Sequence, residues 1–465
     1  MLRSLVLMIA FAGWGIFGDS PCSWGQGADS DKRTEVSAAA ETTQATNAQG
    51  DTAEADVEKI DVEDIDVEAL IAEEPDPQAA ITGPDGETTL GEFMRENPEF
   101  AQGRRAYAKR FAELKDKLAE AIGKQRATFI RYRNRVDRSD QARARYLEER
   151  RDVEEAMERL FEVALDYQNF FGDADSNRYI LRMVRHRLEH DIYDGKTLDA
   201  AVRMIRTGND KLYLFIAAAR SAVVEGKCEN AKQLFDVLLK QEDVDDLDRG
   251  MAGGLPYLQE QYDEEIQRIR ADEAADDLPR VRFETTAGDF VVELYLKDAP
   301  STVSHFIGLV EDGFYKENDF FQVVSKVLAL TGDPNGTGNG HCGKFLKDEN
   351  VGDADARQAM RGSLVMAKYP KGEGEFEPHT ASSQFAILFM PNPGLIQQQT
   401  VFGRVIEGMD VVSRLRRVDP SKEKKKDAIE VAPDRIKRAT VIRRPDELPE
   451  PVYHRVLDAP TTSSD

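Results

Sequence analysis

The sequence predicts a multidomain chain, in which a helical domain is followed by a domain rich in β-strands. Between about residues 90 and 275, the helix-forming residues Ala, Glu, Arg, Leu and Lys dominate, and proline is absent between Pro98 and Pro256. From Arg280 onward the apolar residues alternate with polar ones, which is typical of strands. At 465 residues the chain is long enough for two or three domains.

The composition is acidic, with 62 Lys and Arg against 86 Asp and Glu and a formal net charge of −24. Such a surface repels phosphate, so we expect no nucleic-acid partner and no membrane contact beyond the N-terminal segment. The cysteines Cys22, Cys228 and Cys342 show no metal-ligand spacing. We therefore expect no disulfide framework, no metal and no cofactor.

Residues 1–28 read as a signal peptide. Arg3 precedes the apolar run Leu5–Phe17, which is too short for a comfortable membrane span. The small residues Gly25 and Gly27 then provide a cleavage site before Ala28. An uncleaved membrane anchor is the alternative. Either way we expect the mature chain outside the cytoplasm, in the periplasm or the extracellular space.

Residues 29–85 are expected to form an acidic, disordered linker, because they lack aromatic residues and are rich in Ala, Thr, Glu, Asp and Gln. The linker contains a five-residue repeat, Asp56–Ile60, Asp61–Ile65 and Asp66–Leu70. This period fits neither a helix nor a strand well. The repeat is either a spacer or a docking segment for a basic partner.

The helical domain is expected at residues 86–277. Phe111, Leu114, Leu118 and Ile122 recur every three or four residues, as on one face of an amphipathic helix.

Two later segments, 195–204 and 226–235, share the spacing from Gly to a small Ala and then to a large apolar residue. They resemble degenerate tetratricopeptide (TPR) hairpins, which places a TPR-like region around 176–243. A generic helical bundle is equally compatible with the pattern. The domain would bind a protein partner or hold other domains apart.

The β-rich domain is expected at residues 279–445 and opens with two strands that meet at Gly288. A helix should follow from Ala299 to Val310, because Pro300 suits the first helical turn. We expect residues 446–465 to form a disordered tail.

Several motifs follow in order along this domain, and together they resemble the cyclophilin-type peptidyl-prolyl cis-trans isomerase family. They are Ala299-Pro300 to Val303, Gly313-Phe314-Tyr315, Gly332-Asp333 to Gly338, Asp348-Glu349-Asn350, Gly362 to Ala367, Ser383-Gln384-Phe385 and Val401-Phe402-Gly403. The resemblance implies a cyclophilin-like eight-stranded antiparallel β-barrel with two helices. It also implies an isomerase acting on proline-containing polypeptide clients.

The chemistry that the resemblance implies is rotation about an X–Pro bond, whose barrier is about 18–20 kcal/mol. In the family an arginine donates to the prolyl nitrogen as amide resonance is lost, and an amide side chain holds a backbone carbonyl. The position of the arginine is Gln322 here, while the amide is retained as Gln384. These are the candidate catalytic residues.

The resemblance also assigns the proline pocket. Aromatic residues of the family's pocket become Val327 and Ala386, and the loop Lys371–Pro378 before Ser-Gln-Phe is longer and more charged than in the family. The apolar positions other than Ala386 could equally belong to the barrel core. The candidate substrate-binding residues are Leu328, Leu330, Ala367, Ala386, Leu395 and Gln399.

Three functions remain compatible with this eroded site. The first is an exported isomerase that assists protein folding and is weak, because Gln322 carries no charge. The second is a catalytically inactive module of the same fold that binds proteins. The third is a scaffold whose barrel only packs against the helical domain.

Overall fold

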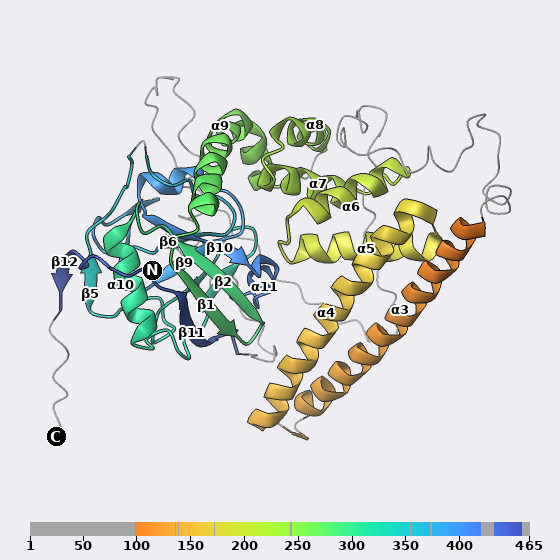
Figure 1. The fold of residues 1–465 in the computed structure, drawn as a ribbon, viewed down its shortest axis with the longest axis horizontal. Coiled ribbons are helices and arrows are strands. Elements are labelled where there is room, and N and C mark those ends of the chain that lie inside the picture. Colours follow the sequence, from red (N-terminus) through yellow and green to blue (C-terminus); the bar gives the residue numbers. More distant parts are fainter. Residues whose placement is uncertain are drawn as a thin grey trace, which may run out of the picture.

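The computed structural model describes residues 98–457, apart from 135, 138, 172, 242–243, 354, 373 and 420–431. The expected signal peptide and acidic linker lie outside these residues. In the described part, helices occupy the chain from Pro98 to Ala275 and strands dominate from Arg280 onward. Figure 1 shows the helices arranged around one side of the β-rich domain.

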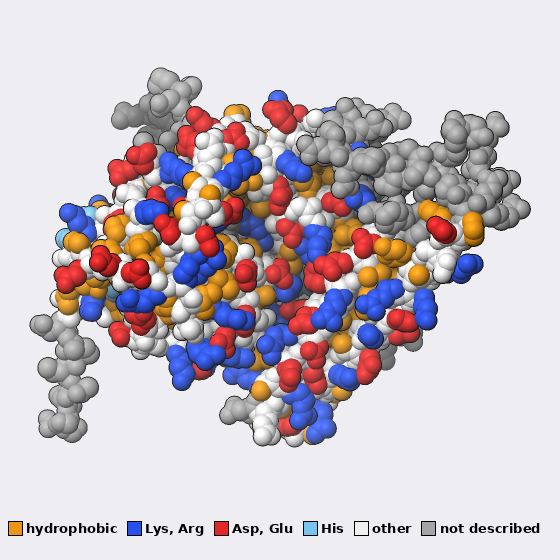
Figure 2. All heavy atoms as spheres, viewed as in Figure 1, with side chains coloured by type: hydrophobic (Ala, Val, Ile, Leu, Met, Phe, Trp, Pro, Cys, Tyr) orange, Lys and Arg blue, Asp and Glu red, His pale blue; other side chains and the backbone are white. Residues whose placement is uncertain are grey.

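The helical domain begins with a long hairpin of α3 (Pro98–Arg133) and α4 (Asp140–Phe171). Phe111, Leu114 and Leu118 are buried in the core of this domain, as their spacing predicts. Ile122 is 44% exposed, so the apolar face ends before it. Charges of both signs alternate over the outer surface of the hairpin (Figure 2), where pairs such as Lys124–Glu120 lie one helical turn apart.

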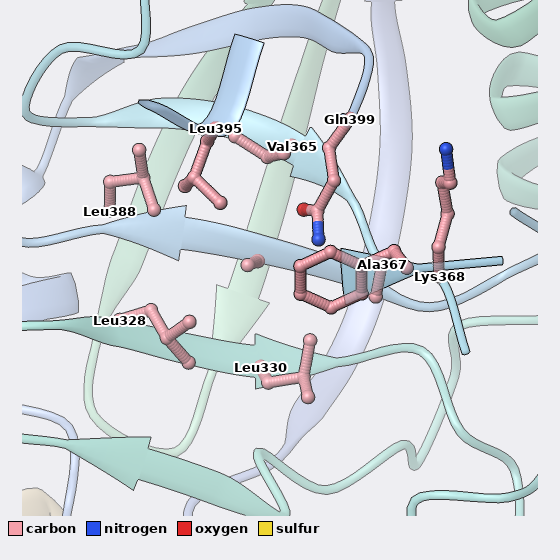
Figure 3. A pocket seen from close by; sticks show the side chains of 10 residues that line it. Leu328, Leu330, Val365, Ala367, Lys368, Leu388, Leu395 and Gln399 are labelled. Carbon is pink, nitrogen blue, oxygen red and sulfur yellow. The ribbon is translucent and has the colours of Figure 1, made fainter. Parts of the chain in front are cut away.

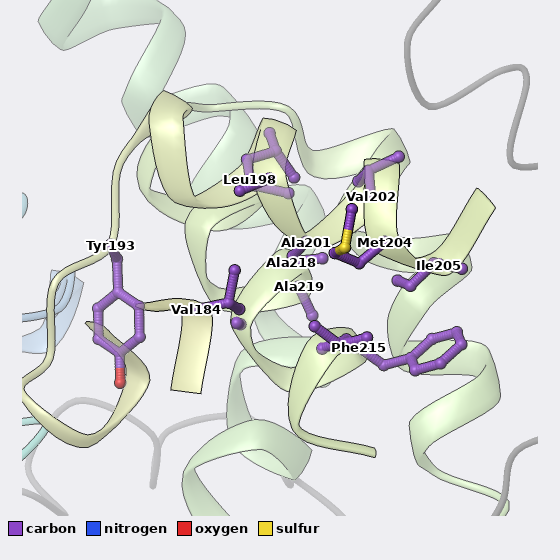
Figure 4. Close-up of a cluster of buried hydrophobic side chains, with 14 of the residues drawn as sticks. Val184, Tyr193, Leu198, Ala201, Val202, Met204, Ile205, Phe215, Ala218 and Ala219 are labelled. Carbon is purple, nitrogen blue, oxygen red and sulfur yellow. The ribbon is translucent and has the colours of Figure 1, made fainter. Parts of the chain in front are cut away.

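Five further helices follow: α5 (Ala174–Glu189), α6 (Gly195–Arg206), α7 (Leu212–Val224), α8 (Cys228–Leu238) and α9 (Asp246–Ala275). Fully buried alanines, including Ala201, Ala218 and Ala219, let these helices approach one another closely (Figure 4). Gly226 has a positive φ of 69°, and a Cβ there would lie 2.1 Å from the Tyr262 ring of α9. The two repeated segments thus begin at α6 and just before α8, and the TPR-like assignment remains a prediction.

The β-rich domain contains an eight-stranded antiparallel sheet in the order β11-β1-β2-β10-β6-β9-β4-β3. Backbone hydrogen bonds join its two ends: Phe320 N donates to Asp434 O (2.8 Å) and Ile436 N donates to Asn318 O (2.9 Å). The sheet therefore closes into a barrel, and α10 (Pro300–Glu311) and α11 (Met409–Ser413) accompany it. This confirms the predicted fold class. The strands are β1 (Arg280–Thr285), β2 (Asp289–Leu294), β3 (Gln322–Val324), β4 (Leu328–Thr331), β6 (Ser363–Met366), β9 (Phe385–Leu388), β10 (Val401–Glu407) and β11 (Ile436–Arg443).

Successive side chains of a strand point to opposite faces, and this separates two apolar clusters in the barrel domain. The interior cluster holds Ala329 together with the rings of Phe283 and Phe385. The second cluster lies on the outer face and holds Leu328 and Leu330, the neighbours of Ala329 along β4. The outer cluster is where the candidate site lies.

The chain beyond residue 445 contains one more strand, so the expected disordered tail is wrong for this part. Strand β12 (Tyr453–Val456) pairs with β5 (Lys344–Leu346). The Tyr453 ring packs edge-on against His305 of α10 at 5.4 Å, and its hydroxyl lies 3.1 Å from His305 Nδ1. These contacts extend the barrel domain past the boundary expected from the sequence.

Buried ion pairs join the helical domain to the barrel. Arg357 Nε donates to Glu265 of α9 at 2.8 Å, and its guanidinium lies 3.6 Å from the centre of the Tyr295 ring. Asp191, between α5 and α6, accepts hydrogen bonds from Lys326 N (2.9 Å) and from Arg417 (2.7 Å). Lys326 forms the turn between β3 and β4, so the helical domain holds the hairpin that carries part of the candidate site.

Candidate active site

A pocket on the outer face of the barrel brings together all of the candidate substrate-binding residues. Figure 3 shows Leu328 and Leu330 on β4, with Leu395 and Gln399 on the opposite side. The lining residues are Leu328, Leu330, Val365, Ala367, Lys368, Phe376, Ala386, Leu388, Leu395 and Gln399. Motif order along the sequence therefore located one contiguous pocket.

Strand register explains why these residues meet. Leu330 lies directly opposite Ala386 of β9, and Ala386 lies opposite Val365 of β6. Cross-strand neighbours share a face of the sheet, so these side chains line one wall. The short helix η3 (Pro393–Gln397) supplies Leu395, whose carbonyl accepts a hydrogen bond from Gln399 N at 2.8 Å and so places both residues at the rim.

Gln322 lies on β3, directly opposite Leu330. Its neighbour Val323 points into the barrel core, so Gln322 shares the outer face with the pocket, although it does not line it. The side chain is 1% exposed, and neither Nε2 nor Oε1 has a hydrogen-bond partner among the described residues. A buried, unpartnered amide costs about 1–3 kcal/mol, which a ligand that accepts from it would recover.

The structure places Gln384 away from the pocket lining. Its Nε2 donates to Gly338 O (3.1 Å) and to Gly340 O (2.7 Å). We expected this amide to hold a carbonyl of the substrate, whereas here it holds the glycine-rich loop of its own chain.

Asp333 organises the same loop. Its carboxylate accepts backbone hydrogen bonds from Asn335 N (2.7 Å) and Thr337 N (2.9 Å). Burial alone would raise the pKa of Asp333, but the backbone donors hold it below its ordinary value. The Gly-Asp motif of this loop thus has a structural role.

The residue that sequence reasoning missed is Phe376. It lies in a hairpin of β7 (Pro370–Gly372) and β8 (Glu375–Phe376), within the long charged loop before Ser383. Its side chain lines the pocket and the residue is 6% exposed. The one available signal was a single aromatic residue in an otherwise charged run.

The pocket is nearly full. Its volume, taken as the space open to the centre of a water molecule, is about 10 Å³. That is barely enough for one water. Gln399 Nε2 is buried at this pocket without a hydrogen-bond partner in the described part of the chain.

A larger cavity, with a volume of about 440 Å³, lies between the α3–α4 hairpin and the barrel. Tyr132 and Tyr146 line it beside Arg143 and Arg416. Burial lowers the pKa of Arg416, although the carboxylate of Asp434, which also lines the cavity, partly opposes this shift. The cavity thus combines aromatic surface with more arginine than carboxylate side chains, since Glu154, Glu189 and Asp434 are its acidic lining residues.

The described part of the chain contains no group of three or more His, Cys, Asp or Glu side chains that could hold a metal ion. None of the helices in the same part is long and apolar enough to span a membrane.

Comparison with known proteins agrees with this geometry. Residues 280–441 match the family model described as cyclophilin type peptidyl-prolyl cis-trans isomerase/CLD. The chain is 37% identical over 138 residues to "Peptidyl-prolyl cis-trans isomerase-like 1" of Aspergillus oryzae, covering 29% of this chain and 80% of that protein. It is 36% identical over 141 residues to "Peptidyl-prolyl cis-trans isomerase CYP18-2" of Arabidopsis thaliana, covering 30% and 80%.

Among solved structures, a cyclophilin type peptidyl-prolyl cis-trans isomerase of Cryptosporidium parvum is 27% identical, with a TM-score of 0.30, covering 36% of this chain and 99% of that one. The fold and the pocket define a cyclophilin-type barrel. The chain belongs to the cyclophilin-type peptidyl-prolyl cis-trans isomerase family through this C-terminal domain.

Proposed function

We propose that this chain is an exported peptidyl-prolyl cis-trans isomerase of low activity that acts on proline-containing polypeptides. One observation carries the proposal: an apolar pocket lies at the family's proline-binding positions, with buried, unpartnered amides beside it in Gln322 and Gln399. Buried polar groups without partners are rare in native proteins and are often explained by function.

The chemistry follows from amide resonance. Leu330, Leu395 and the other apolar side chains would hold the proline ring, while Gln322 Nε2 donates to the prolyl nitrogen as the amide twists. A neutral donor lacks the charge assistance of an arginine, which is worth roughly 1.5–3 kcal/mol. If that bond forms only in the transition state, the rate is roughly 10- to 150-fold lower than with the arginine.

A protease-coupled isomerisation assay on an X–Pro peptide tests the proposal with the full-length chain. We expect a rate above the uncatalysed background and well below that of cyclophilins that retain the arginine. A rate equal to background for the native chain and for a pocket-opened variant would overturn the proposal.

A binding module without catalysis is the second candidate, and the lost charge at Gln322 favours it. Titration of the chain with a proline peptide, followed by NMR, separates the two functions. Peptide binding at the pocket without any catalysed isomerisation would establish the binding module. The scaffold function predicts neither binding nor catalysis.

The proposed export rests on the N-terminal segment alone. Its apolar run and small residues fit a signal peptide that is cleaved before Ala28. Mass spectrometry of the chain from secreting cells should give a mature N-terminus at Ala28. A mature chain that retains Met1 in the cytoplasmic fraction would overturn the proposal.

For the helical domain, we propose an acidic polypeptide partner at the cavity beside α3 and α4. Arg143 and Arg416 provide positive charge there, and Tyr132 and Tyr146 provide aromatic surface. A fluorescent Glu-rich peptide should bind the chain, and Arg143→Glu with Arg416→Glu should weaken binding at least about tenfold, since each reversal replaces an attraction by a repulsion. Equal affinity of the native chain and the double variant for the Glu-rich peptide would rule out this cavity as the binding site.

A further inference from the structure

The long charged loop before Ser383 delivers an aromatic side chain into the proline pocket. We propose that Phe376 is a built-in plug, and that a client reaches the pocket only after the β7–β8 hairpin has moved. This inference rests on the proposed function, because it describes how access to the same site is controlled.

Hydrogen bonds anchor the hairpin to the pocket rim. Phe376 N donates to Gln398 Oε1 at 3.1 Å, and Gln398 Nε2 donates to Gly374 O at 2.9 Å. Gln398 directly follows η3 and stands beside Gln399, a lining residue. One side chain therefore clamps the hairpin turn and strand β8 against the turn that forms the pocket rim.

The base of the hairpin is also fixed. Glu377 N donates to Tyr369 O at 2.8 Å, and Tyr369 N donates to Thr380 Oγ1 at 3.0 Å. Lys368, which lines the pocket, donates to Asp348 at 2.8 Å and to the carbonyl of Gln398. The backbone on both sides of Phe376 is thus held in place, which directs its ring toward the pocket.

The space that remains in the pocket shows whether Phe376 fills the pocket, as a plug, or only forms one of its walls. Ala386 and Val327 stand where the family has aromatic residues, so Phe376 could be thought to replace a missing wall. A wall would leave room for a proline ring beside it. The remaining space is only about 10 Å³, so the ring of Phe376 takes the volume that a proline ring needs.

The free energy of burying the Phe376 ring favours the closed hairpin but is small enough for the hairpin to open. Burial of an aromatic side chain favours the closed hairpin by roughly 10- to 150-fold over an exposed ring. The hairpin lies at the surface, with Lys371, Gly372 and Glu375 exposed. Opening therefore disturbs one short hairpin, while the barrel strands stay paired.

The test is Phe376→Ala in the full-length chain, with two readouts: affinity for an X–Pro peptide by NMR titration, and catalysed isomerisation. We expect affinity to rise roughly 10- to 150-fold, because the peptide no longer competes with the ring. Gln398→Ala keeps the ring and removes the clamp, so a smaller rise is expected. Glu375→Ala is the matched control, since this exposed residue of the same hairpin does not line the pocket.

The possible results separate a plug from a wall and test the isomerase function independently of the plug. Unchanged affinity in Phe376→Ala, or affinity that falls, would overturn the plug, and a fall would make Phe376 a wall. Tighter peptide binding by Phe376→Ala, with no catalysed isomerisation by this variant or by the native chain, would support the plug and overturn the proposed isomerase function. Thermal unfolding of each variant shows that the barrel is intact, and Gln398→Ala tests the plug independently should Phe376→Ala fail to fold.

Discussion

At the scale of residues, Gln322 is buried opposite Leu330, and its amide has no hydrogen-bond partner in the described part of the chain. It occupies the position at which the cyclophilin pattern has an arginine. Motif spacing could locate this side chain because strands keep a fixed register. Spacing could not locate Phe376, because the loop that carries it has no counterpart in the family pattern.

Restoration of the charge should restore activity once the pocket is open. In the Phe376→Ala background, Gln322→Arg should raise kcat/KM roughly 10- to 150-fold, because a charge-assisted bond replaces a neutral one. The protease-coupled assay measures this. Gln322→Leu in the same background is the control, and a gain with leucine would show that packing, not hydrogen bonding, controls the rate.

His305 should make the stability of the barrel depend on pH. Burial, with Lys344 nearby, lowers its pKa to about 4, although the hydrogen bond to Ser382 O partly opposes this shift. The folded state then resists protonation below the ordinary pKa of about 6.5. The stabilisation by neutral His305 is complete above pH 6.5 and is lost as the pH falls toward 4, by at most about 3 kcal/mol.

Denaturant unfolding between pH 7.5 and 4 checks this expectation. The free energy of unfolding of His305→Gln should fall less steeply with decreasing pH than that of the native chain. His454→Gln, at an exposed position, should retain the native slope. Equal slopes for the native chain and His305→Gln would contradict the expectation.

At the scale of elements, the sequence predicted β1, β2 and α10 well, since Gly288 and Pro300 mark their ends. The structure explains the Asp348-Glu349-Asn350 motif. The Glu349 carboxylate accepts hydrogen bonds from Ser301 N (2.8 Å) and Thr302 N (2.7 Å) and so caps the start of α10. Strand β12 was missed. It is short and mostly exposed, and its pairing with β5 is a long-range contact that local pattern cannot show.

Removal of β12 should destabilise the barrel domain. Truncation after residue 445 removes Tyr453 and exposes the edge of β5 and one side of His305. We expect the melting temperature to fall by roughly 2–4 °C for each kcal/mol of stability that is lost, the scale for a domain of this size. Truncation after Leu457 is the control and should leave the melting temperature unchanged. An equal melting temperature for both truncations would show that β12 contributes nothing.

At the scale of the whole molecule, the sequence predicted the order of the domains but not how they join. The joint depends on side chains far apart in the chain, such as Arg357 with Glu265 and Asp272 of α9. Burial raises the pKa of Glu265 despite the nearby Arg357. Loss of the arginine would leave this carboxylate buried and uncompensated.

Arg357→Met should therefore destabilise the junction by about 3–5 kcal/mol, the usual cost of breaking a buried pair from one side. Differential scanning calorimetry should show the single native transition splitting into separate helical and barrel transitions. Arg159→Met, in an exposed pair with Glu155, should change stability by less than about 1 kcal/mol. A single, unshifted transition for Arg357→Met would contradict the expectation.

Closure of the barrel also sets an order of events during synthesis. Strand β1 pairs with β2 and with β11. Residues 280–285 therefore gain their second partner strand only after residues 436–443 have been synthesised. The helices from α3 to α9 make their main contacts with neighbours in sequence and can assemble earlier. Local contacts form faster than distant ones. The newly made barrel segment therefore emerges beside a surface that is already folded, and α9 would offer Glu265 and Asp272 to Arg357 before the last strand arrives.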